Sequence, residues 1–193
     1  MSFVANPFVV VLDANVLFPF RVRDVLLTFA QEGLFRARIT NDILDEWTRS
    51  LIRLKPHLEK SVRQQETAIR SNFDECIVSG YHPLIEGLEL PDLDDRHVLA
   101  AAIRCSAQVI VTENHHKDFP SRVLEEYGIE TLGADDMLAN TYDLFPAGGA
   151  RALRKVRSRY DDPPMRSSEF LLDLTRCGLS KLAAAARSDI EYI

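Results

Sequence analysis

The stretch Phe8-Val-Val-Val-Leu-Asp13-Ala-Asn15 decides the fold of this chain. Its apolar residues run without interruption, and three of them are β-branched valines. A short continuous apolar run of this kind is typical of a strand that is buried on both faces of a parallel sheet. The sequence therefore predicts that Asp13 emerges at the carboxyl end of a buried strand.

More strands and helices are predicted after this run. Val109-Ile-Val-Thr112 indicates a second buried strand, and residues 129–132 indicate a short third one. Because strands alternate with helical patterns, we expect an α/β domain with a parallel sheet. Helices are predicted over residues 24–32, 42–55 and 58–77, after an N-cap at Asp94, and over residues 121–127 and 135–144.

A helical extension is predicted to follow the sheet domain. Pro146-Ala-Gly-Gly149 marks the expected boundary, which gives a domain over residues 1–146 and a C-terminal extension over residues 147–193. The extension contains a basic helix through Tyr160, a break at Asp161-Asp-Pro-Pro164 and two further helical stretches.

The composition favours one intracellular globular unit. The chain has 193 residues, of which 46% are hydrophobic, and three cysteines without a Cys-x-x-Cys pair. No signal peptide is recognised, and no apolar run approaches the roughly 18 residues of a membrane span, so we expect a soluble, cytoplasmic protein. The net charge is −6, yet residues 21–63 and 147–193 each hold nine Lys/Arg against six Asp/Glu. An acidic protein can thus still present basic rims to a nucleic acid.

Carboxylates from distant parts of the sequence are expected to meet at one edge of the sheet. Asp13 ends the first strand, Glu46 lies on the second predicted helix, and Asp95 lies in the first turn of a later helix. The carboxyl ends of parallel strands and the adjacent helix starts form the usual ligand crevice. Asp118 follows the second clear strand and is the candidate for a fourth oxygen ligand.

Such a cluster predicts a divalent metal site. Carboxylates brought close together repel one another unless protons, hydrogen bonds or cations neutralise them. Hard oxygen ligands suit Mg²⁺ or Mn²⁺ better than zinc. One or two such ions would catalyse displacement at a phosphodiester without a serine or cysteine nucleophile. The sequence shows no evident nucleophile of that kind.

Other polar residues are candidates for supporting roles. Asn15, Thr112 and Asp92 are expected to support the carboxylates or contact substrate. Arginine suits bidentate phosphate contacts, which makes four arginines the candidate RNA-binding residues. These are Arg21, Arg23, Arg49 and Arg53.

Four motifs in order resemble the PIN-domain ribonuclease family, with spacing most similar to VapC-like toxins. They are Val11-Leu-Asp-Ala-Asn-Val-Leu17, Ile43-Leu-Asp-Glu-Trp47, Asp92-Leu-Asp-Asp-Arg-His-Val-Leu-Ala-Ala101 and Val111-Thr-Glu-Asn-His-His-Lys-Asp-Phe-Pro120. The resemblance covers roughly residues 8–145. It implies a PIN-like α/β/α sandwich and a Mg²⁺- or Mn²⁺-dependent endoribonuclease, which inhibits translation, forms a homodimer and is neutralised by a cognate antitoxin.

Asp13, Glu46 and Asp95 match the three acidic positions of the family. Many members place an aspartate two residues after the strand threonine, whereas this chain has Asn114. The fourth ligand is therefore either Asn114 or Asp118.

Two other functions stay open at this point. A PIN fold with weak catalysis could act by binding RNA or a protein. Asn114, which stands where many members have an aspartate, is the feature that supports this alternative. A phosphohydrolase with an aspartyl nucleophile also places an aspartate after its first strand. Such enzymes usually carry a second aspartate two residues later, where this chain has Asn15.

Overall fold

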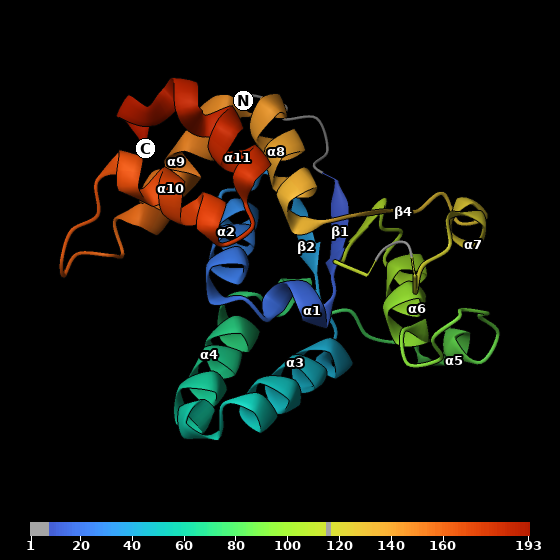
Figure 1. Ribbon diagram of the computed structural model, residues 1–193. Helices are drawn as coiled ribbons and strands as arrows, with labels where there is room; N and C mark the ends of the chain where they lie inside the picture. Colours follow the sequence, from blue (N-terminus) through green and yellow to red (C-terminus); the bar gives the residue numbers. More distant parts are fainter. Residues whose placement is uncertain (1–7, 115–116) are drawn as a thin grey trace. The chain divides into compact units, whose positions relative to one another are not determined.

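A parallel sheet forms the centre of the part of the chain that carries the predicted carboxylates. A computed structural model describes residues 8–114 and 117–193. The sheet has four strands in the order β2-β1-β3-β4, and β1 (Val9–Leu12) pairs in parallel with β3 (Val109–Val111). Val10 lies opposite Val109 in this pairing, and both are buried. The predicted α/β fold with a buried parallel sheet is confirmed (Figure 1).

The described chain divides into two compact units. The sheet unit comprises residues 8–18 and 37–131, and the helical unit comprises residues 19–36 and 132–193. The predicted domain boundary at residue 146 stays a prediction, since by its contacts the helical unit also includes residues 19–36 and 132–146. Elements of the sheet unit besides β1 and β3 are α1 (Ala14–Leu17), α3 (Asn41–Leu54), α4 (Glu59–Asn72), α5 (His82–Ile85), α6 (Arg96–Arg104) and α7 (Ser121–Glu125).

The two outer strands lie where the units join along the chain. They are β2 (Arg36–Arg38) and β4 (Glu130–Leu132). The sequence did not predict β2, because its three residues are Arg-Ala-Arg and only Ala37 is buried. Strands this short at the edge of a sheet carry almost no hydrophobic alternation.

Helix α3 places one of the predicted ligands. Thr40 caps it, since its hydroxyl oxygen accepts a hydrogen bond of 3.0 Å from the Ile43 amide. Ile43 and Trp47 lie one turn apart on the same face and are fully buried. Glu46, next to Trp47, stays at the edge of this face. Helix α4 packs against α3, and α6 packs against β1 and β3.

The helical unit contains a helix whose start differs from the prediction. Helix α2 (Phe20–Gln31) begins after Pro19, and not at Asp24. Asp24 lies inside the helix and binds Arg159 and the hydroxyl of Tyr160. The remaining elements are α8 (Ala134–Leu144), α9 (Pro146–Arg157), α10 (Ser167–Arg176), α11 (Ser180–Ala185) and a 3₁₀ segment, η3 (Ala186–Tyr192). Among the described helices, none has both the length and the apolar character that crossing a bilayer requires.

Gly149→Ala is expected to destabilise the protein by about 1–3 kcal/mol, because it overpacks the start of α9. A Cβ at Gly149 would meet Cδ2 and Cε2 of the Tyr142 ring, the latter at 2.8 Å. This ring is 1% exposed, and its hydroxyl donates a 2.8 Å hydrogen bond to Asp189, so it has little room to move. Urea unfolding followed by circular dichroism measures the loss.

Gly148→Ala is the matched control for this prediction. Its Cβ would meet the tip of the flexible Leu34 side chain at 2.6 Å, which can rotate away, and Arg151 Nη2 at 3.7 Å, an ordinary contact distance. The higher helix propensity of alanine, up to about 1 kcal/mol, offsets the remaining cost. Equal losses in the two variants would contradict the role of the Tyr142 ring.

Candidate metal centre

Three hydrogen-bond donors fix the carboxylate of Asp13 at the end of β1. Its Oδ1 accepts from the Ala14 amide at 2.6 Å, and its Oδ2 accepts from Asn15 Nδ2 at 2.7 Å and from Thr112 Oγ1 at 2.8 Å. Asn15 Oδ1 in turn accepts from the Glu113 amide at 3.1 Å. Asp13 is only 4% exposed. The ends of β1 and β3 thus hold one charged group in a single orientation.

Three further aspartates bring their oxygens together beside the start of α6. One carboxylate oxygen each of Asp92, Asp95 and Asp118 lies within 4.8 Å of the other two. Asp118 is 4% exposed, whereas Asp92 is exposed. A group of carboxylates is a hard-oxygen donor set, which fits Mg²⁺ or Mn²⁺. These residues could therefore hold a metal ion.

The cap of α6 differs from the prediction. Asp95, and not Asp94, is the N-cap residue, and its side chain makes no capping hydrogen bond. The Asp94 amide donates instead to Oδ1 of Asp92 at 2.9 Å. The sequence assigned Asp92 a supporting role, whereas the structure places it with Asp95 and Asp118. The sequence separated Asp92 from Asp94 but gave no signal that would rank it with Asp95.

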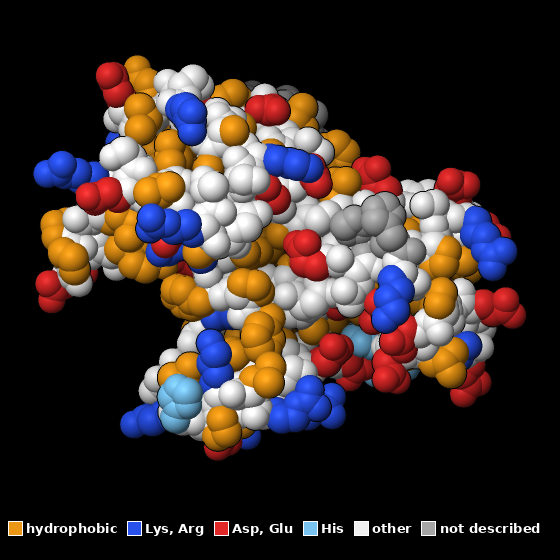
Figure 2. Space-filling view, viewed as in Figure 1, with side chains coloured by type: hydrophobic (Ala, Val, Ile, Leu, Met, Phe, Trp, Pro, Cys, Tyr) orange, Lys and Arg blue, Asp and Glu red, His pale blue; other side chains and the backbone are white. Residues whose placement is uncertain are grey.

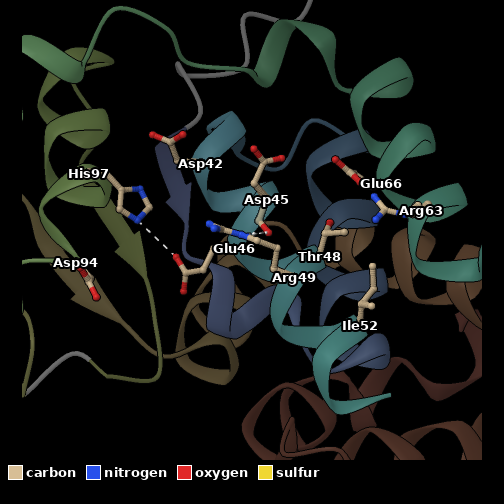
Figure 3. Close-up of a pocket in the computed structure, with 10 residues that line it drawn as sticks. All are labelled: Asp42, Asp45, Glu46, Thr48, Arg49, Ile52, Arg63, Glu66, Asp94 and His97. Atoms are coloured by element: carbon tan, nitrogen blue, oxygen red, sulfur yellow. Dashed lines mark hydrogen bonds and ion pairs between the residues drawn. The ribbon is translucent and has the colours of Figure 1, made fainter. Parts of the chain in front are cut away.

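Glu46 faces His97 across the gap between α3 and α6. His97 Nε2 lies 3.5 Å from Glu46 Oε2, as the dashed line in Figure 3 marks. Burial lowers the pKa of His97, but the hydrogen bond with Glu46 and the charges of Glu46, Asp42 and Asp13 outweigh burial and raise the pKa overall. The His97 imidazole therefore links Glu46 on α3 to the first turn of α6.

The carboxylates act on one another electrostatically. Burial is the main cause that raises the pKa of Asp95 to about 7, and the charges of Asp13, Asp118, Asp92 and Glu46 raise it further. Burial also raises the pKa of Asp13, although the hydrogen bonds from Thr112 and the backbone partly oppose this. Among the described residues, Asp13 and Glu46 lie outside the group of three that shares a 4.8 Å neighbourhood. Their charges nevertheless reach Asp95.

The surface view is consistent with an acidic centre beside a basic rim. In Figure 2, acidic side chains and histidine gather where Figure 1 shows α3 and α6. Lys and Arg side chains gather over α3 and α4 on the same face. This distribution suits a ligand that carries negative charge and needs a cation at its reacting group.

Two family models match the chain. A PIN domain model matches residues 9–116, which include β1, α3, α6 and β3. The chain belongs to the PIN-domain family. A second model, described as the VapC50 C-terminal domain, matches residues 134–188. The predicted family is confirmed, and the PIN domain is followed by a separately matched helical segment.

A curated relative supports the same assignment. The PIN-domain chain is 34% identical over 132 residues to "Putative ribonuclease VapC50" of Mycobacterium tuberculosis (strain ATCC 25618 / H37Rv). The matched region covers 68% of this chain and 76% of that protein. No solved structure matches the chain.

The arginines predicted to bind RNA have different surroundings. In the helical unit, Arg21 forms a 2.6 Å ion pair with Asp173, and its guanidinium lies 4.0 Å from the Tyr160 ring centroid. Arg23 is 4% exposed, and burial lowers its pKa to about 10. Arg49 and Arg53 are exposed on α3 of the PIN domain. All four assignments stay predictions.

The fourth ligand position has two described candidates. Asp118 is buried in the aspartate group, with Lys117 Nζ at 3.9 Å from its Oδ1. Asn114 is exposed and builds the turn with its backbone, since its amide donates to Thr112 Oγ1 and its carbonyl accepts from the Asp118 amide. His115 and His116, between them, lie outside the described residues.

Asp95→Asn is expected to remove a pH-dependent loss of stability from the metal-free PIN domain. The folded chain holds the Asp95 proton more tightly than the unfolded chain, because the pKa rises from 3.8 to about 7. This contribution to stability is therefore fully present below pH 3.8 and is lost as the pH rises through about 7. Melting temperatures in EDTA across this range should fall more steeply for the wild type than for Asp95→Asn.

Asp94→Asn is the control, since Asp94 is an exposed neighbour on the same loop. It should keep the pH dependence of the wild type. Parallel curves for the wild type and Asp95→Asn would refute the prediction.

Proposed function

We propose that this protein is a metal-dependent endoribonuclease and the toxin of a toxin–antitoxin pair. Membership of the PIN-domain family and the likeness to a protein named as a ribonuclease support the proposal. The observation that carries it is the aspartate group formed by Asp92, Asp95 and Asp118 beside the fixed carboxylate of Asp13. Carboxylates this close suit a divalent cation at the end of a parallel sheet.

The proposed mechanism gives each carboxylate a distinct task. Asp13, Glu46, Asp95 and Asp118 are the proposed metal ligands, and Asp92 joins them from the loop. Mg²⁺ or Mn²⁺ held there would supply Lewis acidity and offset the charge that develops on the phosphodiester. Asn15 and Thr112 keep the Asp13 carboxylate in one orientation.

Exposed arginines are the proposed contacts to the RNA backbone. Arg49 and Arg53 follow Glu46 along α3, so phosphates bound there would lie next to the carboxylates. We propose that Arg21 and Arg23 contribute less to RNA binding. Arg21 is already paired with Asp173, and Arg23 is buried.

Cleavage of RNA by the purified protein tests the proposal. Total RNA is incubated with Mg²⁺, with Mn²⁺ and with EDTA, and the 5′ ends of the products are sequenced. Discrete cuts that need the divalent ion are the expected result. Binding of RNA without cleavage under all these conditions would instead favour a PIN-fold binding module.

The proposed partners and location need separate tests. We propose a homodimer, a cytoplasmic location and a cognate antitoxin. Light scattering coupled to gel filtration measures the oligomeric state. Growth arrest on induction, relieved by co-expression of a small protein encoded beside the toxin, is the expected signature of the antitoxin.

A further inference from the structure

A cavity of about 720 Å³ runs along α3, and Glu46, one of the proposed metal ligands, lies in its lining. Figure 3 shows that its lining side chains fall into two groups. At one end lie Glu46, His97, Asp42 and Asp94, near the start of α6. At the other end, between α3 and α4, lie Thr48, Ile52, Arg63 and Glu66. Asp45 and Arg49 lie between the two groups.

We propose that the α3–α4 end of this cavity binds a guanine base of the substrate RNA, next to the phosphate that is cut. This inference rests on the proposed ribonuclease function and adds a substrate preference to it. The cavity volume falls within the usual range for a small-molecule site, roughly 300–1,000 Å³, so a base and its ribose fit. Because one nucleotide joins a base to a phosphate, the two ends would bind parts of the same molecule.

Arg63 supplies the donors that guanine needs on its Hoogsteen edge. Its Nε donates to Glu59 Oε1 at 2.9 Å, but the two side chains are 61% and 51% exposed. An exposed pair of this kind contributes little to stability, so Arg63 can exchange Glu59 for a ligand. A guanidinium bound to O6 and N7 is the commonest specific contact to guanine, and it discriminates against other bases.

Carboxylates on the same walls supply the acceptors for the opposite edge. Arg70 Nη2 donates to Glu66 Oε1 at 2.8 Å and to Asp45 Oδ1 at 2.9 Å. These bonds use one oxygen of each carboxylate, and they hold Glu66, whose side chain is 17% exposed, more firmly than Asp45, whose side chain is 55% exposed. The other oxygens can accept from N1–H and the 2-amino group of guanine. Guanine has two acceptors, O6 and N7, on one edge and two donors, N1–H and the 2-amino group, on the next. An arginine on one wall and carboxylates on the other match this arrangement.

Thr48 adds a polar group whose hydrogen bonding is incomplete. It is 4% exposed, and within residues 8–114 and 117–193 its Oγ1 has no hydrogen-bond partner. Buried hydroxyls nearly always have one, so this group points to a ligand. Thr48 lies in the lining of the cavity, and threonine has two χ1 rotamers available in a helix, so its hydroxyl can adjust to a ligand. Ile52 supplies an apolar wall against which a base can pack.

The two ends of the cavity differ in charge, which decides which end suits the phosphate and which end suits the base. The end near α6 carries the carboxylates that suit a metal-bound phosphate, together with His97. The α3–α4 end carries Arg63 against Glu66, so it is nearly neutral and suits an uncharged base. Arg49 lies between the ends: its Nε donates to the Asp45 carbonyl at 3.2 Å, and its guanidinium points toward the end that holds Glu46 and His97 (Figure 3).

Cleavage of an RNA pool with random sequence tests this inference. The wild type should cut with guanine enriched at one position beside the cut. Arg63→Ala and Thr48→Val should each lower that enrichment at least about fivefold, as expected for the loss of one specific base contact. Arg122→Ala, an exposed arginine on α7 outside the cavity, should leave it unchanged. Melting temperatures show that each variant is folded.

A binding measurement separates recognition from catalysis. In an Asp13→Asn background, short RNAs with guanosine, inosine or adenosine at the enriched position should bind in that order of affinity. Inosine keeps O6 and N7 but lacks the 2-amino group, so it tests the carboxylate side. Absence of Asp13-dependent cleavage in the wild type would overturn the proposed function. Cleavage without guanine enrichment, or with the same enrichment in Arg63→Ala and Thr48→Val, would overturn the base site alone.

Discussion

Asp13→Asn is expected to lower the rate of Mg²⁺-supported RNA cleavage by at least on the order of a hundredfold. Loss of a residue that only supports a metal ligand costs about 10–100-fold, and a ligand should cost at least the upper end of that range. The substitution keeps the size of the side chain and removes its charge. It also replaces one oxygen with an amide that donates. Single-turnover cleavage of an end-labelled RNA measures the effect.

The cause lies in the three donors around this carboxylate. Ala14 N, Asn15 Nδ2 and Thr112 Oγ1 all donate to Asp13 oxygens, so the new amide must face at least one donor. The Thr112 hydroxyl can rotate to accept, which keeps the fold intact. It cannot restore the negative charge that attracts a divalent cation.

Thr112→Val provides a graded comparison. It removes one donor to Asp13 but keeps the charge, so the rate should fall about 10–100-fold, the range for residues that orient a metal ligand. RNA affinity, measured by fluorescence anisotropy, should change little in either variant. A folded Asp13→Asn protein that cuts RNA at the wild-type rate would remove the proposed mechanism.

The buried strands were predictable because their signal is local. Val9–Leu12 and Val109–Val111 are uninterrupted apolar runs, and each is followed by a polar residue that reaches the site. A strand covered on both faces leaves few alternatives for such a run. Asp13 at the end of the first strand was predicted on the same ground.

Features that depend on tertiary contacts were not predictable from local patterns. Arg23 is buried although arginine is rarely fully buried, and nothing in its neighbourhood distinguishes it from Arg21. Asp24 resembles an N-cap, yet α2 extends back to Phe20, and Arg159 binds the carboxylate inside the helix. Arg21 and Asp24 take their partners, Asp173 and Arg159, from segments more than a hundred positions away.

The proposed base site illustrates the same limit at the functional level. Thr48 and Arg63 lie on helices that the sequence predicts separately, and no spacing rule relates them. They line one cavity only because α4 packs against α3. Sequence patterns locate the carboxylates that a family shares, whereas the pairing of helices decides which side chains surround the substrate.

Asp118→Asn is expected to raise the dissociation constant for Mn²⁺ about 100-fold, whereas Asn114→Ala should leave it within about threefold. Asp118 is 4% exposed, and an oxygen of it lies within 4.8 Å of oxygens of Asp92 and Asp95. Asn114 shapes the turn through its backbone, which alanine retains. The buried aspartate is therefore the stronger candidate for the fourth ligand.

The stabilisation by Mn²⁺ gives a readout that does not depend on catalysis. At an ion concentration of 100 times the wild-type dissociation constant, binding stabilises the wild type by about 2.7 kcal/mol, and a 100-fold weaker site leaves about 0.4 kcal/mol. Without the ion, Asp118→Asn should not destabilise the protein at neutral pH, because the charge of Asp118 contributes to raising the pKa of Asp95. If Asn114→Ala loses the Mn²⁺ effect and Asp118→Asn retains it, the amide is the ligand and the assignment of Asp118 is wrong.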